Sequence, residues 1–335
     1  IPLSTTKGDF KKPIKILYYT DRSKGYSGEP VKGIDKMFKM SGDYAIAFLR
    51  VMPHAAEPER MQKNIAAMQE VKLQKLSEDL GKPSKPVEKV NFPAFNTNPV
   101  IYENNYLYVM QFVFNHTTFD PKDKMYQAVL AALKPLGVEP GKVYDPDAVV
   151  KIDGKKFADM EKKIFKESVA IGSDPGGDPY MYDMFKPKGE MKLEVMVKQS
   201  ATGPIGVPAH QAVYPPIVTT DGKLMNAQND YVIRMSKDAM PPAKAFWSAT
   251  LYDLKNGFFI PNDRKKYSVG ENAGMKLNKD GGIQIYVAAQ KPENVPEENW
   301  LPINRKDEAL DIIMRIYEPD MEKLKPWNTP RAEKL

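Results

Sequence analysis

Apolar residues return at two different spacings along the chain, and the longer spacing predicts three helices in its first half. Over residues 58–80, 120–135 and 155–171 they recur every three or four positions, the period of a helix with one buried face. Asp120 precedes the second segment and is a residue type that caps helices by accepting backbone amide hydrogens. We interpret all three stripes as core positions, because a one-sided stripe is typical of helices packed on a protein interior.

Strands are predicted where apolar and polar residues alternate one by one. The early candidates are residues 15–20 and 44–51, and after Met191 the chain consists almost entirely of short runs of this kind. Asp-Gly and Asn-Gly pairs separate such runs and favour hairpins, because these residues tolerate positive φ. The three pairs are at 221–222, 256–257 and 280–281. The pattern therefore predicts an α+β, β-rich fold.

A central segment rich in Asp, Pro and Gly suggests two domains. We expect residues 1–172 to form a mixed α+β unit, and residues 185–335 to form an antiparallel β-sandwich or jelly-roll-like unit packed on it. Residues 173–184 are the expected connection, because their Pro and Gly residues interrupt regular structure. A length of 335 residues suits two domains of ordinary size.

Four C-terminal runs show the same division between their two faces: 231–235, 246–253, 283–287 and 312–317. One face of each run is apolar and the other is polar or aromatic, since neighbouring residues of a strand point to opposite sides. We expect a single sheet with one apolar and one polar face. The candidate ligand-binding residues of the polar face are Arg234, Tyr252, Tyr286, Arg315 and Tyr317.

Two interpretations of this polar face remain open. It is either solvated or covered by the N-terminal half, with its tyrosines and arginines hydrogen-bonded, or it binds a sugar or another small polar organic molecule. In the second case Arg234 or Arg315 would receive a carboxylate or phosphate, since guanidinium groups bind oxyanions through paired hydrogen bonds.

The composition removes several kinds of chemistry. The chain has no cysteine, which excludes thiol nucleophiles, disulfides, iron–sulfur clusters and thiolate zinc sites. It also lacks a P-loop, a Gly-x-Gly-x-x-Gly segment, a His-Glu-x-x-His pair and a Gly-x-Ser-x-Gly elbow. We therefore expect no cofactor.

Weak candidates for proton transfer and for a metal remain. His210 could act as a general base only with an orienting carboxylate that the sequence does not reveal. Asp253 could form an acid pair with Asp263, although Asp in turns more often caps backbone amides. Ca²⁺ prefers oxygen ligands, which the central loop offers at a spacing unlike that of an EF-hand. The residues concerned are Asp174, Asp178 and Asp183.

Charge and hydropathy limit the partners. The net charge is +6, but basic residues are interleaved with acidic ones, so we expect no nucleic-acid partner. The apolar runs are far shorter than the about 20 residues of a membrane-spanning helix, and no transmembrane segment is expected. The chain begins at Ile1 rather than Met, which we interpret as a processed or excised N-terminus.

Several spaced blocks in the C-terminal part resemble the domain-of-unknown-function family 1214, over about residues 185–331. They are AKAFWSATLYD at 243–253, KYSVG at 266–270, DGGIQIY at 280–286, NWLP at 299–302, RIYEP at 315–319 and PW at 326–327. Residues 203–206 and 209–214 fit the same family. The resemblance implies that Trp247, Tyr252, Trp300 and Arg315 are signature positions, of which Trp247 belongs to the core by its place in the alternation.

Residues 14–145 look more weakly like the second half of the usual companion, the domain-of-unknown-function family 1254. The similarity rests on residues 43–50, on Gln69 leading to Leu76-Ser77, and on Leu136-Gly137-Val138 followed by Pro140-Gly141. The Asn- and Asp-rich opening segment of that family has no counterpart in this sequence, so no site residue can be carried over from it.

The two resemblances imply a bacterial protein, periplasmic or secreted, and no settled activity. We expect it to bind or hydrolytically process a small polar organic or carbohydrate ligand, with Tyr252 and Arg315 orienting it and Asp253 or His210 carrying the proton. The alternative is a non-catalytic structural or assembly subunit that pairs with copies of itself through β-sheet edges.

Overall fold

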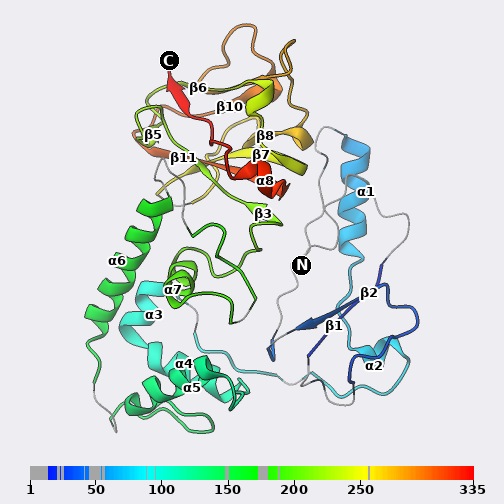
Figure 1. Cartoon of the computed structure of the whole chain (residues 1–335), viewed down its shortest axis with the longest axis vertical. Coiled ribbons are helices and arrows are strands. Elements are labelled where there is room, and N and C mark those ends of the chain that lie inside the picture. Colours follow the sequence, from blue (N-terminus) through cyan, green and yellow to red (C-terminus); the bar gives the residue numbers. More distant parts are fainter. Residues whose placement is uncertain are drawn as a thin grey trace. The chain divides into compact units, whose positions relative to one another are not determined.

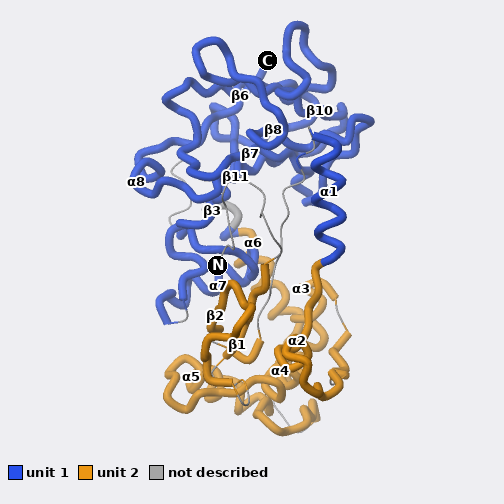
Figure 2. The backbone as a smooth tube through the Cα atoms, turned by 90° about the vertical axis from the view of Figure 1, so that its right-hand side faces the viewer, with its two compact units in different colours: residues 1–8, 50–70, 167–335 blue, residues 9–49, 71–166 orange. Residues whose placement is uncertain are grey.

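The computed structural model describes residues 14–20, 23, 26–40, 42–44, 54, 57–87, 89–94, 96–147, 151–172, 180–187, 189–255 and 257–335. The chain divides into two compact units, which Figure 2 shows in two colours. Unit 1 comprises residues 1–8, 50–70 and 167–335, and unit 2 comprises residues 9–49 and 71–166. The domain boundaries expected at residues 172 and 185 stay a prediction.

Unit 2 combines a small parallel sheet with several helices (Figure 1). Its two strands, β1 (Ile16–Thr20) and β2 (Lys36–Met40), pair in parallel. The helices are α2 (Leu76–Asp79), α3 (Asn98–Asn104), α4 (Tyr106–Asn115), α5 (Lys124–Leu133) and most of α6 (Gly154–Gly172). A short 3₁₀ turn, η1 (Lys134–Leu136), follows α5. The buried cluster of this unit is small and consists of Leu107, Phe114 and Val138.

The helix predicted over residues 155–171 forms as α6, whereas the helix predicted over 58–80 is shorter. It forms α1 (Pro58–Gln69), with Pro58 in the first turn, and a separate turn, α2, follows after the non-helical residues 71–75. Proline suits the first turn because its missing amide hydrogen would have no helical acceptor there.

The second predicted helix forms as α5, but the expectation that Asp120 caps it is wrong. The carboxylate of Asp123 accepts the amide hydrogens of Met125, at 2.9 Å, and Tyr126, at 3.2 Å. Asp120 accepts the amide hydrogen of Lys122 instead, which makes a turn that leads into the cap. The helix therefore begins three residues later than Pro121.

The sequence pattern missed α3, α4, α7 (Leu193–Thr202) and β2. Helix α4 has the sequence YLYVMQFVFN, which is apolar on nearly every side and so lacks a one-sided stripe. Helix α7 contains Val195 and Val197, and β-branched residues favour strands. The expectation that the chain after Met191 is almost entirely β-structure is wrong for this helix. The strand expected over residues 44–51 lies almost entirely outside the described residues.

The C-terminal part of unit 1 is a sandwich of two β-sheets, as the pattern predicted. One sheet has the strand order β10-β9-β6-β12, and the other has the order β3-β11-β7-β8. Strands β4 and β5 also pair with β11. The pairs formed by these strands are antiparallel except β9 with β10. The bounds are β3 (Ala212–Val213), β4 (Pro216–Ile217), β5 (Met225–Asn226), β6 (Tyr231–Met235), β7 (Ala243–Asp253), β8 (Ser268–Gly270), β9 (Ile283–Ala288), β10 (Trp300–Pro302), β11 (Ala309–Pro319) and β12 (Ala332–Lys334). Helix α8 (Met321–Leu324) follows β11.

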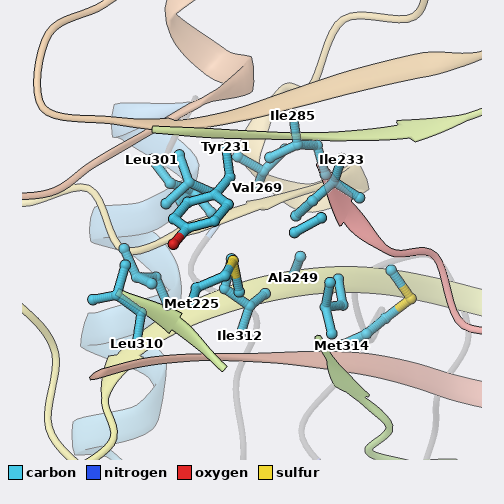
Figure 3. Close-up of a cluster of buried hydrophobic side chains, with 14 of the residues drawn as sticks. Met225, Tyr231, Ile233, Ala249, Val269, Ile285, Leu301, Leu310, Ile312 and Met314 are labelled. Carbon is cyan, nitrogen blue, oxygen red and sulfur yellow. The ribbon is translucent and has the colours of Figure 1, made fainter. Parts of the chain in front are cut away.

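The two sheets bury a common apolar core between them. Figure 3 shows Ile233 and Ile285 of one sheet pointing toward Ala249, Ile312 and Met314 of the other, and all five are fully buried. The buried Trp247 belongs to the same cluster, as its place in the alternation predicted. Each sheet therefore has its apolar face inside and its other face outside.

All three predicted Asp-Gly or Asn-Gly turns have their glycine at positive φ, but only one joins neighbouring strands. Gly257 lies in the connection between the antiparallel strands β7 and β8, and Asn256 lies outside the described residues. Gly222 lies between β4 and β5, which both pair with β11 rather than with each other. Gly281 precedes β9, whose partners are β6 and β10.

Candidate functional site

The expectation of one sheet with one polar face is wrong, because the four strands concerned belong to two sheets. Strands β6 and β9 are neighbours in one sheet, and β7 and β11 are neighbours in the other. Since the apolar faces of both sheets meet in the common core, their polar faces lie on opposite outer sides of the sandwich. Arg234 and Tyr286 are thereby separated from Tyr252, Arg315 and Tyr317.

The outer face of β7 and β11 holds most of the candidate residues, and we call it the β7–β11 outer face. Its residues are Phe246, Ser248, Thr250 and Tyr252 of β7, and Asp311, Ile313, Arg315 and Tyr317 of β11. The register places Tyr317 opposite Phe246, Arg315 opposite Ser248, Ile313 opposite Thr250, and Asp311 opposite Tyr252. The alternate residues of both strands are buried in the core, which fixes the direction of this face.

Arg315 crosses this face diagonally to reach Tyr252. Its Nη2 donates a hydrogen bond of 2.6 Å to the Tyr252 hydroxyl, and its guanidinium carbon lies 5.4 Å from the centroid of the Tyr252 ring. Its Nη1 is buried and has no hydrogen-bond acceptor among the described residues. A buried charged donor without an acceptor costs free energy, so its presence calls for an explanation.

Asp311 is the carboxyl group next to this arginine. It lies four residues before Arg315 on the same strand face and directly opposite Tyr252. Burial raises the pKa of the Asp311 carboxyl, and attraction to Arg315 offsets this only in part. Burial and a specific charged partner together are a combination found at functional sites.

Aromatic rings flank Arg315 on both sides along the face. On one side Tyr252, Phe259 and Tyr267 form a stack, with ring centroids 5.3 Å and 4.6 Å apart and interplanar angles of 22° and 8°. On the other side the rings of Phe246 and Tyr317 lie 4.4 Å apart. Phe259, in the β7–β8 connection, is 48% exposed. The face thus offers flat apolar surfaces next to a guanidinium group.

Strand β8 completes the face with small residues. Gly270 is opposite Ser248, and Ser268 is opposite Thr250, whose hydroxyl donates a hydrogen bond of 3.3 Å to the Ser268 hydroxyl. A Cβ atom on Gly270 would lie 2.6 Å from the Trp247 carbonyl oxygen and 2.8 Å from the Ser248 Cα. Glycine is therefore required for the close approach of β8 to β7.

On the other outer side of the sandwich, Arg234 and Tyr286 are engaged with their own sheet. Arg234 forms an ion pair with Glu333 of β12, and both side chains are exposed. The Tyr286 hydroxyl donates a hydrogen bond of 2.8 Å to Gln284 Oε1. This arrangement matches a solvated sheet surface, where ion pairs contribute little to stability.

The proposed proton carriers do not lie on the β7–β11 outer face. Asp253 follows Tyr252 directly on β7 and therefore points to the other side of the strand. Its carboxylate accepts the amide hydrogen of Lys255 at 2.8 Å, as a turn-capping Asp does. His210 is exposed in the turn before β3. Asp311, which pattern analysis did not single out, is the carboxyl group that the fold brings to Arg315.

The calcium candidates are not brought together within the described residues. Asp174 and Asp178 lie outside the described residues, and Asp183 forms an ion pair with Lys186. Among the residues that the structure describes, no group of three or more His, Asp or Glu side chains is placed to hold a metal ion. Likewise, none of the described helices combines the length and the apolar character that crossing a bilayer requires.

The signature tryptophans of the resemblance have structural roles. Trp247 fills the core, and the Trp300 indole nitrogen donates a hydrogen bond of 2.8 Å to the Ala288 carbonyl oxygen. The guanidinium carbon of Arg264 lies 5.5 Å from the centroid of the Trp300 ring. Of the four signature positions, Tyr252 and Arg315 are therefore the two that lie on the β7–β11 outer face.

The structure thus defines an α+β protein whose C-terminal unit is a two-sheet β-sandwich with an arginine on one outer face. Residues 211–321, which hold β3 to β11, match a family described as "Protein of unknown function (DUF1214)". The resemblance expected for the C-terminal part is therefore confirmed, whereas that of residues 14–145 to family 1254 stays a prediction. The comparison with curated proteins gave no match.

Two solved structures resemble the chain to different extents. The crystal structure of the VPA0106 protein from Vibrio parahaemolyticus aligns with a TM-score of 0.64 and 20% identity, over 96% of this chain and 75% of that chain. A crystal structure of an uncharacterised protein from Burkholderia cenocepacia aligns with a TM-score of 0.28 and 19% identity, over 39% of this chain and 31% of that chain. The first likeness shows a common fold.

Proposed function

We propose that the protein binds a small organic anion on the β7–β11 outer face, with Arg315 as the receptor for its carboxylate. The observation that carries this proposal is the buried Nη1 of Arg315, which has no acceptor among the described residues. A bound carboxylate oxygen would supply the missing acceptor, and hydrogen bonds between guanidinium and carboxylate groups are among the strong ones.

The surroundings of Arg315 favour an anion that carries a ring. Tyr252 holds the guanidinium group by its hydroxyl, so the arginine is oriented before a ligand arrives. The stack of Tyr252, Phe259 and Tyr267 presents aromatic rings beside it, which suit the flat face of an aromatic ring or a sugar. Binding sites of this kind combine apolar surfaces with a few placed polar groups.

Binding is better supported than hydrolysis. A hydrolytic enzyme needs a proton carrier within reach of the bound substrate. Asp253 and His210, the carriers expected from the sequence, lie elsewhere, and Asp311 is engaged electrostatically with the arginine that would hold the ligand. The geometry therefore supports a receptor for an anion, and the periplasmic or secreted location expected from the family resemblance belongs to the same proposal.

Calorimetric titration with benzoate tests the proposal, because benzoate joins a carboxylate to a flat ring. The wild-type protein should bind benzoate and should not bind benzamide, its neutral analogue. Arg315→Ala should weaken benzoate binding at least about tenfold, since each hydrogen bond to a charged group contributes about 1.5–3 kcal/mol. Glucuronate and glucose, compared in the same way, show whether a sugar ring is accepted.

Arg234→Ala is the matched control, because Arg234 lies on the other outer face. It should leave benzoate binding unchanged. Arg315→Ala should alter the free energy of unfolding by less than about 1 kcal/mol, since it removes an unsatisfied buried donor together with its hydrogen bond to Tyr252. Equal losses of binding in both variants, or a loss of stability of several kcal/mol in Arg315→Ala alone, would contradict the proposal.

The alternative function, assembly of copies through paired β-sheet edges, has less support from the edge strands of the sandwich. Its outer strands β8, β10 and β12 contain three residues each, and β3, β4 and β5 contain two each. Strand β12 also carries Glu333 and Lys334, and β4 and β10 contain proline. Short, charged or proline-containing edges are the devices that prevent edge-to-edge pairing.

A further inference from the structure

We propose that the site at Arg315 takes up one proton together with its anion, and that Asp311 receives this proton. The inference rests on the proposed function and deepens it, because it names a condition under which the site binds. It assigns Asp311 the role of a residue that controls anion binding through its charge.

The geometry that carries this inference is the placement of three side chains on one face. Asp311 and Arg315 lie on the same side of β11, and Tyr252 stands opposite Asp311 in the register. Because the guanidinium group donates to the Tyr252 hydroxyl, it lies at the residue that pairs with Asp311. The described residues include no direct ion pair between Asp311 and Arg315, so the guanidinium is held by the phenol rather than by the carboxylate.

A carboxylate ligand bound at Arg315 would be repelled by the ionised carboxylate of Asp311. Two carboxylates that share one partly buried site cannot both ionise easily, because their repulsion is weakly screened there. One of them must take up a proton, or the ligand must bind more weakly. The guanidinium group binds the ligand at its Nη1, so the ligand remains charged and Asp311 is the group that becomes neutral.

The free protein already favours the neutral form of Asp311 more than an exposed carboxyl would. Burial raises the pKa of the Asp311 carboxyl, and the attraction of Arg315 compensates only partly. A ligand that neutralises Arg315 weakens this attraction and adds a repulsion. Both changes raise the pKa of Asp311 further, and by linkage the affinity for the anion rises as Asp311 becomes protonated.

Charged groups at the end of β7 and on the connections that adjoin β7 and β11 have partners of their own. Asp253, at the end of β7, caps the amide of Lys255 in the following turn. Between β4 and β5, Asp221 forms an ion pair of 2.7 Å with Lys223. In the β7–β8 connection, Lys266 donates a hydrogen bond to the Glu298 carbonyl oxygen. Of the described charged groups, Arg315 is the one that acts electrostatically on the pKa of Asp311.

The test is a calorimetric titration of the 335-residue chain with benzoate between pH 5.5 and pH 8. Carboxylates of this kind have pKa values near about 4, so benzoate stays charged over this range. The affinity of the wild-type protein should fall as the pH rises, by at most about tenfold per pH unit, over the interval between the pKa of Asp311 in the free protein and its higher pKa in the complex. Titrations in two buffers of different ionisation enthalpy should show uptake of up to one proton per benzoate.

Asp311→Asn mimics the protonated carboxyl, and Asp307→Asn is the matched control. Asp307 is exposed and lies four residues before Asp311, where its carboxylate accepts a hydrogen bond from Asn226. The Asp311→Asn variant should bind benzoate with a constant affinity at all these pH values and without proton uptake. The Asp307→Asn variant should keep the pH dependence of the wild-type protein.

The outcomes separate this inference from the proposed function. Benzoate binding that depends on Arg315 but not on pH, with no proton uptake, would overturn the role of Asp311 and leave the anion site in place. Failure of the wild-type protein to bind benzoate at any of these pH values would overturn both. If Asp311→Asn does not fold, the carboxyl carbon signal of Asp311 in the wild-type protein decides, since benzoate added at pH 7 should shift it toward its protonated value.

Discussion

Asp311 has an environment that differs from what its sequence position suggests. It lies on a strand between two buried residues, Leu310 and Ile312, yet its own side chain points to the outer face next to Arg315. Because burial raises the pKa of its carboxyl, the folded protein holds the Asp311 proton more tightly than the unfolded chain does.

This pKa shift predicts a pH-dependent stability. Between the ordinary Asp pKa of about 3.9 and the raised value in the folded protein, the folded state binds more protons than the unfolded state. The contribution of Asp311 to stability is therefore fully present below this interval and is lost as the pH rises through it. The Asp311→Asn variant should not show this loss of stability with rising pH.

Urea denaturation at pH 3 and pH 7 measures the effect. The variant should gain stability relative to the wild-type protein on going from pH 3 to pH 7, and Asp307→Asn should show no such gain because Asp307 is exposed. A wild-type protein whose advantage over Asp311→Asn grows with pH would show that attraction to Arg315 outweighs burial.

Candidate residues could be predicted from the sequence only where strand alternation reveals them. Alternation with apolar neighbours predicts a polar face for Tyr252, Arg315 and Tyr317, and the structure places all three on one outer face. Extending the same alternation by one step, from Ile313 to Asp311, would have included the carboxyl group. Phe259 carries no such signal, since it lies in the connection between two strands and stacks on Tyr252 through the path of that connection.

At the scale of the elements, the alternation predicts which side of a strand is buried but not which sheet the strand joins. Both sheets of a sandwich turn their apolar faces inward, so β6, β7, β9 and β11 have the same pattern although they belong to two sheets. Only the strand pairing shows that Arg234 and Arg315 belong to different sheets. Helix α4 escaped prediction for a related reason, because a segment that is apolar on all sides shows no period.

The pairing of β8 with β7 depends on Gly270. A Cβ atom there would come within 2.6 Å of a backbone carbonyl oxygen, which cannot move aside as a flexible side chain can. Gly270→Ala should therefore reduce the free energy of unfolding by about 1–3 kcal/mol, the range for a substitution that forces backbone shifts. Urea denaturation of the variant and of the wild-type protein measures this change in the free energy of unfolding.

Gly203→Ala is the control for Gly270→Ala, because both glycines have extended φ values and Gly203 has no atom within 4 Å of its Cβ position. It should change the free energy of unfolding by no more than about 0.5 kcal/mol. Equal effects of the two substitutions would mean that loss of glycine flexibility, rather than the close approach of β8 to β7, determines the stability.

At the scale of the whole molecule, the sandwich has a core of its own. The buried residues that join its two sheets all lie between Ala209 and Ala332, and unit 2 has a separate, smaller cluster. A domain that contains its own core can in principle fold alone. The chain shares its fold with the VPA0106 protein over 96% of its length, although the two sequences are only 20% identical.

A fragment of residues 180–335 should therefore fold cooperatively without the rest of the chain. Its near-ultraviolet circular dichroism should show an ordered environment for Trp247, which is buried between the two sheets. A fragment that keeps secondary structure but gives no near-ultraviolet signal would contradict this prediction, because such a state lacks fixed core packing.

The anion site at Arg315 is the central claim, and a crystal structure of the protein grown with benzoate tests it most directly. We predict that the benzoate carboxylate accepts a hydrogen bond from Arg315 Nη1, with Nη2 still bonded to Tyr252 and the ring beside the aromatic stack. Benzoate bound at Arg234 instead, or Nη1 bonded to another part of the protein's own chain, would contradict the claim.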